Sequence, residues 1–106
     1  MNVLVTGCNG FLGRELQRIF KENEYKFIFT NRQILDVLSE NAVDNFFDIN
    51  DIDVVVHTAV KGGRRDHKDL IKSFNDNLKM FGNLFRNRDK FKLMINFGSG
   101  AEFDRT

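Results

Sequence analysis

The sequence predicts an α/β fold in which a parallel β-sheet carries helices on both faces. Short apolar segments, typical of buried strands, alternate with segments whose apolar residues recur every three or four positions, as in amphipathic helices. This alternation implies right-handed βαβ crossovers, which join parallel strands. A length of 106 residues, with 42% hydrophobic and 29% charged residues, suits one soluble globular domain and leaves too little chain for two.

The first unit is a strand, a glycine turn and a helix. NVLVT at 2–6 is a continuous apolar run rich in β-branched residues, typical of a strand buried on both faces. From Phe11 onward the period changes to that of a helix. The residues expected on its apolar side are Phe11, Leu12, Leu16, Ile19 and Phe20.

The second unit begins with YKFIFT at 25–30, a second strand. A short helix is expected within SENAVDNFF at 39–47, and Ser39 suits its N-cap. DVVVHTA at 53–59 is again an apolar strand.

A long amphipathic helix and a last strand complete the predicted order. The helix is expected from about His67 to Arg86, and KLMINFGSG at 92–100 is the last strand. Because this strand lies close to the C-terminal residue of the chain, we expect a sheet that is incomplete on its C-terminal side. The apolar residues of the helix are Leu70, Ile71, Phe74, Leu78, Phe81, Leu84 and Phe85.

Charge and cysteine content narrow the function classes. Sixteen Lys and Arg against fifteen Asp and Glu leave a net charge of +1, so no overall field favours nucleic acid or a membrane surface. The single cysteine, Cys8, excludes an internal disulfide, and a cytoplasmic location is expected because no secretion signal is visible. No metal site is expected, because no carboxylate or cysteine joins His57 or His67 at ligand spacing.

The strongest motif is the glycine turn formed by Gly7, Gly10 and Gly13. It joins a buried strand to a helix N-terminus, where unpaired N–H groups and the helix dipole favour a phosphate. This context predicts dinucleotide binding in a Rossmann-type domain spanning residues 1–106. The alternative is a merely tight structural turn. Thr6 and Asn9 are expected to shape the turn through hydrogen bonds, and Cys8 to be a small turn residue.

The end of the second strand indicates which cofactor is bound. An acidic residue there typically binds the ribose hydroxyls of NAD, whereas this chain has Arg32, whose guanidinium suits the 2′-phosphate of NADP. The alternative is a solvated surface arginine. Asp36 and Val37 follow and are expected at the adenine edge, although Asp36 equally suits a cap on the next helix.

The motifs together resemble the extended short-chain dehydrogenase/reductase family, the NAD(P)-dependent nucleotide-sugar epimerases, dehydratases and reductases. The spacing Thr6-Gly7-x-x-Gly10-x-x-Gly13 matches the family's glycine motif. DVVVHTAV at 53–60, NLKMFGNLF at 77–85 and NFGSG at 96–100 are similar to three further family segments. Within the family, TNRQILDVLSENAVDNFF and AVKGG resemble segments of the GDP-fucose synthases.

The resemblance implies a set of site residues. Ser99 would orient the substrate group that exchanges hydride. Lys61, Arg64 and Arg65 form a small basic loop that suits either a phosphate contact or solvent. The residues that the resemblance places around NADP, with NAD as the less favoured cofactor, are Gly7, Asn9, Gly10, Phe11, Leu12, Gly13, Arg32, Asp36, Val37, Ala59, Val60 and Lys61.

The family's catalytic Tyr-x-x-x-Lys pair is absent from these 106 residues, whose only tyrosine is Tyr25. Two interpretations remain. The chain is the cofactor-binding portion of a longer epimerase/reductase that acts on a nucleotide-diphosphate sugar, or it is a non-catalytic dinucleotide-binding or protein-interaction domain. An exposed sheet edge would also allow self-association as a homodimer.

Overall fold

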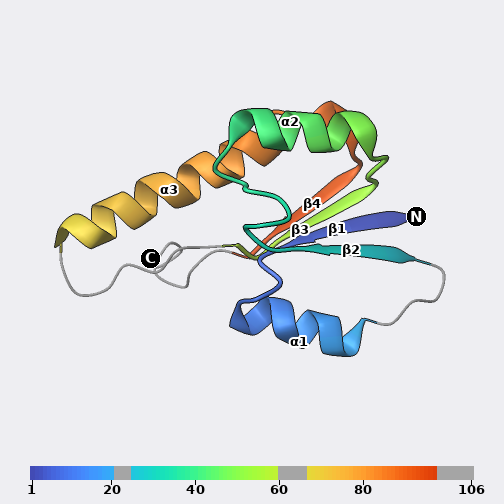
Figure 1. Ribbon diagram of the computed structural model, residues 1–106, viewed down its shortest axis with the longest axis horizontal. Coiled ribbons are helices and arrows are strands. Elements are labelled where there is room, and N and C mark those ends of the chain that lie inside the picture. Colours follow the sequence, from blue (N-terminus) through green and yellow to red (C-terminus); the bar gives the residue numbers. More distant parts are fainter. Residues whose placement is uncertain (21–24, 60–66, 98–106) are drawn as a thin grey trace.

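The computed structural model describes residues 1–20, 25–59 and 67–97, the side chains of 67–70 excepted. These parts form a four-stranded parallel sheet with helices on both faces, so the predicted fold class is confirmed (Figure 1). Helix α1 lies on one face, and α2 and α3 lie on the other. The elements in chain order are β1 (Asn2–Thr6), α1 (Phe11–Ile19), β2 (Lys26–Thr30), α2 (Glu40–Ile49), β3 (Val54–His57), α3 (His67–Phe85), a 3-10 turn (Arg88–Lys90) and β4 (Leu93–Asn96).

The strand order β2-β1-β3-β4 places β1 in the interior of the sheet. Alternate β1 residues point to opposite faces. Leu4 joins the core beneath α2 and α3, whereas Val3 and Val5 join the smaller core beneath α1. The register pairs Thr6 with both Thr30 and His57, so the carboxyl ends of three strands meet at one edge of the sheet.

Helix α1 buries less of its predicted apolar side than expected. Leu16 packs against the core of β1, β2 and β3, but Phe11 is 83% exposed and Ile19 is 60% exposed. The reason is that one helix alone covers this face of the sheet among the described residues, so the flanks of its apolar side have no neighbour.

Helix α2 begins where the sequence predicts, because Ser39 accepts a hydrogen bond from the Ala42 N–H at 3.2 Å. Asp36 is therefore not the cap of this helix. Its carboxylate accepts from the Leu38 N–H at 3.1 Å and shapes the turn before the cap. One of the two roles expected of Asp36 is thus wrong.

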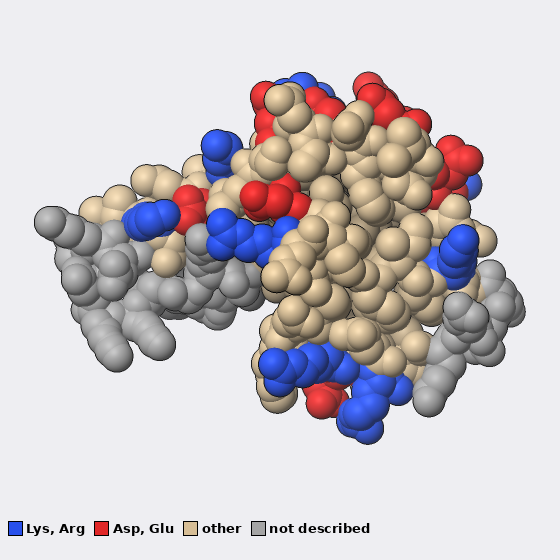
Figure 2. All heavy atoms as spheres, viewed as in Figure 1, with Lys and Arg blue, Asp and Glu red and all other residues tan. Residues whose placement is uncertain are grey.

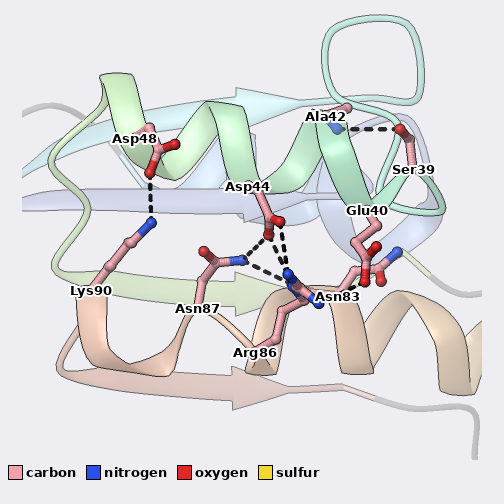
Figure 3. A network of polar contacts seen from close by, with 9 residues as sticks. All are labelled: Ser39, Glu40, Ala42, Asp44, Asp48, Asn83, Arg86, Asn87 and Lys90. Carbon is pink, nitrogen blue, oxygen red and sulfur yellow. Dashed lines mark hydrogen bonds and ion pairs between the residues drawn. The ribbon is translucent and has the colours of Figure 1, made fainter.

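A polar network joins α2 to α3 (Figure 3). The guanidinium of Arg86 contacts Asp44 at 3.0 Å and Glu40 at 2.6 Å, and Asn87 donates to Asp44 at 2.9 Å. Hydrogen bonds from Asn87 and Arg86 lower the pKa of Asp44 from its ordinary value of 3.8. Lys90, in the turn after α3, adds a contact of 2.6 Å to Asp48. The two helices are therefore held in register by directed polar contacts as well as by packing.

Helix α3 fully buries only part of its predicted apolar side, at Leu84. Its buried residues are Met80, Asn83 and Leu84, followed by Asn87 just beyond its end. Four residues of the predicted apolar side are exposed by 44–58%: Ile71, Phe74, Leu78 and Phe85. Among the described side chains of the predicted apolar set, only Leu84 is therefore fully buried, because α2 and the sheet contact α3 along a side on which asparagine amides also satisfy buried backbone groups.

The charges are distributed by face. Figure 2 shows Asp and Glu gathered over α2, while Lys and Arg gather over α1.

Strand β4 forms one edge of the sheet and exposes Leu93 and Ile95. In the described parts of the chain, no helix is long and apolar enough to cross a membrane.

Candidate functional site

A cavity of about 260 Å³ lies where the carboxyl ends of β1, β2 and β3 meet. Ligands of open α/β sheets bind at this kind of position, outside the carboxyl ends of the strands where the chain reverses its order. The cavity is lined by Gly7, Asn9, Gly10, Asn31, Arg32, Leu35, Asp36, Val37, Leu38, Thr58, Ala59 and Met80.

The glycine turn forms one wall of the cavity. Gly7 has φ +76°, and a Cβ atom there would lie 2.6 Å from the Ala59 nitrogen. Only glycine both adopts a positive φ readily and leaves the space that a Cβ atom would fill. The Gly10 N–H donates to the Gly7 carbonyl at 3.0 Å, and Gly10 is the N-cap of α1. Because Gly10 has no side chain with which to cap the first-turn N–H groups, the helix N-terminus is suited to a phosphate.

Hydrogen bonds to helix α1 and strand β2 hold this turn in place. Gln17 donates to the Cys8 carbonyl at 2.8 Å, and the Cys8 N–H donates to the Thr30 carbonyl at 3.0 Å. Cys8 is 7% exposed, and its sulfur lies 3.8 Å from the Asn9 side-chain oxygen. The turn is therefore held by backbone contacts to β2 and by a side-chain contact from α1.

A buried network joins the ends of β1 and β3. The Thr6 hydroxyl accepts from the Thr58 N–H at 3.2 Å and the Ala59 N–H at 3.3 Å, and it lies 2.7 Å from His57 Nδ1. With two donors already directed at its oxygen, Thr6 donates its hydrogen to Nδ1, which must be unprotonated. The Thr58 hydroxyl donates to the Thr6 carbonyl at 2.6 Å. His57 is therefore a buried histidine at the end of β3 that is held by a hydrogen bond to Thr6.

Burial lowers the pKa of His57 from 6.5 to about 4. Because His57 binds a proton more readily in the unfolded chain than in the folded one, the free energy of unfolding is highest above pH 6.5. It falls as the pH drops from 6.5 toward 4. The loss is expected to reach about 3 kcal/mol, at about 1.4 kcal/mol for each pKa unit. Urea unfolding followed by circular dichroism between pH 7 and pH 4 measures it.

The His57→Asn variant tests the assignment, because asparagine keeps an acceptor near Thr6 but does not titrate. Its unfolding free energy should lose most of the dependence between pH 6.5 and 5, whereas the control His67→Asn should keep it. If the free energy of unfolding of His57→Asn depended on pH as strongly as that of the parent chain, the assignment of this dependence to His57 would be refuted.

The loop between β2 and α2 forms the opposite wall. The Asn31 carboxamide accepts from the backbone N–H groups of Gln33 and Ile34 at 2.9 and 3.0 Å and so makes the turn. Arg32 is exposed at the rim, and no carboxylate pairs with it in the part of the chain that the structure describes. Its guanidinium is therefore available to an anion at the mouth of the cavity.

The structure brings together seven of the residues expected around the cofactor: Gly7, Asn9, Gly10, Arg32, Asp36, Val37 and Ala59. Phe11, Leu12 and Gly13 lie in the first turn of α1, outside this lining. Val60, Lys61 and Ser99 lie outside the described residues, as does the basic loop with Arg64 and Arg65.

Sequence reasoning missed five residues of the lining: Asn31, Leu35, Leu38, Thr58 and Met80. Asn31 and Thr58 follow directly after strands, so their position at the carboxyl edge was a usable signal. Met80 had no comparable signal, because only the packing of α3 against the loop after β2 brings it to the cavity.

The parallel sheet, the glycine turn between β1 and α1, and the cavity at the switch point define a Rossmann-type fold. Within this class, the chain belongs to the NAD dependent epimerase/dehydratase family, whose model matches residues 3–106.

Named relatives make the comparison more specific. GDP-L-colitose synthase of Yersinia pseudotuberculosis is 23% identical over 109 residues, covering 99% of this chain and 35% of that protein. A dTDP-4-dehydrorhamnose reductase from Clostridium acetobutylicum superposes with a TM-score of 0.78 at 28% identity, over 88% of this chain and 34% of the other. The chain thus spans about a third of the length of these relatives.

Two similar structures contain NADP. GDP-mannoheptose C4 reductase from Campylobacter jejuni, with NADP bound, has a TM-score of 0.76 at 26% identity, over 93% of this chain and 33% of the other. A GDP-L-fucose synthetase from Naegleria fowleri, bound to NADP, has a TM-score of 0.76 at 27% identity, over 90% of this chain and 32% of the other.

Proposed function

We propose that this chain is the cofactor-binding portion of an NAD(P)-dependent nucleotide-sugar epimerase/reductase and that it prefers NADP. The observation that carries the proposal is a single cavity with the glycine turn on one wall and Arg32 at the rim of the other. NADP needs both, because its pyrophosphate and its 2′-phosphate are separate anionic groups, whereas NAD has only the pyrophosphate. The NADP bound in the similar GDP-mannoheptose C4 reductase and GDP-L-fucose synthetase supports the same choice of cofactor.

The residues fit the pyrophosphate. A Cβ atom built on Gly10 would meet only the Gly7 carbonyl oxygen, at 3.4 Å, so the space beside Gly10 is open to a ligand. The uncapped first turn of α1 faces the same end of the sheet. Bound NADPH would supply the hydride for a reduction, and the residues described here would bind and orient the cofactor.

The substrate proposed is a nucleotide-diphosphate sugar, by analogy with the named relatives, among which are GDP-sugar and dTDP-sugar enzymes. Ser99 is the residue proposed to orient its reacting group. Tyr25 does not take part, because it precedes β2 at the amino edge of the sheet, opposite the cavity. The function proposed for these 106 residues is therefore cofactor binding, without the proton transfer of the full reaction.

Isothermal titration with NADPH tests the proposal. The parent chain should bind NADPH, and Gly10→Val should weaken binding at least about tenfold because its side chain occupies the phosphate space. The far-ultraviolet circular dichroism of Gly10→Val should remain that of the parent, since the added atoms point into the cavity.

Gly82→Ala is the matched control, because nothing lies within 4 Å of a Cβ atom at that position on α3. It should bind NADPH as the parent does. A Gly10→Val variant with unchanged affinity would show that the turn is only structural, and a parent chain that does not bind NADPH would refute the proposed function.

A further inference from the structure

Asn83 is a buried polar residue on α3 that does not line the cavity but contacts its wall. It is 6% exposed, and its side-chain Nδ2 donates to the backbone carbonyl of Val37 at 2.8 Å. The two residues are 46 positions apart in sequence. A hydrogen bond of this kind fixes a loop to a helix at a defined point.

The loop that Asn83 holds is the wall expected to contact the adenosine half of the cofactor. Leu35 and Val37 direct their side chains into the core and are 4% and 5% exposed, which keeps the backbone between them close to the interior. A buried carbonyl without a hydrogen-bond partner destabilises the fold, so the Val37 carbonyl requires a donor such as Asn83. Met80, about one turn earlier on α3, lines the same cavity.

Asn83 is in turn part of the contact between α2 and α3. Its own backbone carbonyl accepts from Asn87 Nδ2 at 3.1 Å, and Asn87 also donates to Asp44 at 2.9 Å. Asp44 pairs with Arg86 at 3.0 Å (Figure 3). The position of the Val37 carbonyl is therefore connected to the register of the two helices rather than to the loop alone.

We propose that Asn83 is a positioning residue for the cofactor site: its amide holds residues 35–38 at the distance from the glycine turn that the adenosine half of a dinucleotide requires. This inference rests on the proposed function for the identity of the ligand. It assigns to α3 a role in adenosine affinity, although Asn83 touches no part of the ligand.

The test compares Asn83→Ser with Asn87→Ser. Asn87 is the matched control because it is an equally buried amide, 5% exposed, in the same network, and it does not contact the cavity wall. Serine at position 83 is too short to reach Val37. Calorimetric titration with 2′,5′-ADP, the adenosine half with its two phosphates, should show about fivefold weaker binding for Asn83→Ser. Asn87→Ser should bind 2′,5′-ADP with an affinity within about twofold of the parent, even if its melting temperature falls as far as that of Asn83→Ser.

A second measurement does not depend on the ligand. Hydrogen exchange at the backbone amides of residues 36–38 should be faster in Asn83→Ser than in Asn87→Ser or the parent chain. Where circular dichroism shows that Asn83→Ser is unfolded, Asn83→Gln replaces it, since its longer side chain keeps the amide and displaces the wall.

The outcomes separate the two proposals. If both serine variants weakened 2′,5′-ADP binding equally, the effect would be general destabilisation and the role of Asn83 would be overturned. Unchanged affinity and unchanged hydrogen exchange in the position-83 variants would overturn it as well. A parent chain that fails to bind 2′,5′-ADP would count against the proposed function, and the exchange at residues 36–38 would then decide on Asn83 alone.

Discussion

A Gly13→Ala variant is expected to lose a large part of the stability of the native fold. A Cβ atom at Gly13 would overlap the Gly7 carbonyl oxygen and lie 2.7 Å from the Cys8 Cα and 2.8 Å from the Gly7 carbonyl carbon. All three are backbone atoms of the glycine turn, so no side chain can rotate away. Helix α1 would have to separate from β1, with loss of the packing of Leu16 against the core.

Such overpacking costs about 3 kcal/mol or more, a large part of the roughly 5–15 kcal/mol that stabilises a domain. We expect the melting temperature of Gly13→Ala to fall by more than about 10 °C in thermal unfolding followed by circular dichroism. The control Gly82→Ala should melt higher than the parent, because alanine is favoured over glycine by about 1 kcal/mol in a helix interior and the site is open. Melting of Gly13→Ala at the parent temperature would contradict the close approach of α1 and the turn.

Removal of the Arg32 side chain is expected to abolish the preference for NADPH over NADH. Arg32 lines the cavity at its exposed rim, where the 2′-phosphate would lie once the pyrophosphate occupies the glycine turn. Charge-assisted hydrogen bonds contribute roughly 1.5–3 kcal/mol, and the lower end suits an exposed group. The parent chain should therefore bind NADPH at least about tenfold more tightly than NADH, and Arg32→Ala should bind the two within about twofold.

Two controls accompany this titration. Arg18→Ala, which removes an exposed arginine paired with Glu15 on α1, should change neither affinity. Arg32→Lys should keep part of the preference, because lysine retains the charge without the bidentate geometry. Equal affinities of the parent for NADPH and NADH would refute the assignment of Arg32, and so would a preference that survives in Arg32→Ala.

Much of the fold could be predicted because its signals are local. The apolar run before Gly7 predicts β1, the change of period after Gly10 predicts α1, and Ser39 caps α2 at the expected position. Each of these features depends on residues that are neighbours in sequence. The glycine turn was predicted for the same reason, since its three glycines stand between adjacent elements.

The error at α3 shows where this reasoning fails. Periodicity correctly predicts a helix from His67, but it takes the more apolar side for the buried one. The structure buries Leu84 of that side, but it also buries Asn83 and Asn87 and exposes Phe74 and Leu78. Which side of a helix is buried depends on the direction from which other elements contact it, and that direction is not encoded in the local pattern.

The sequence by itself determined the order of strands and helices, the glycine turn and the presence of an arginine after β2, because each depends on a few consecutive residues. Only the tertiary structure decided that Met80 lines the cavity, that Thr6 and His57 join two strands, and that Asn83 holds the wall at Val37. The two hydrogen bonds join residues 51 and 46 positions apart, and they form only when βαβ crossovers bring the carboxyl ends of parallel strands to one edge.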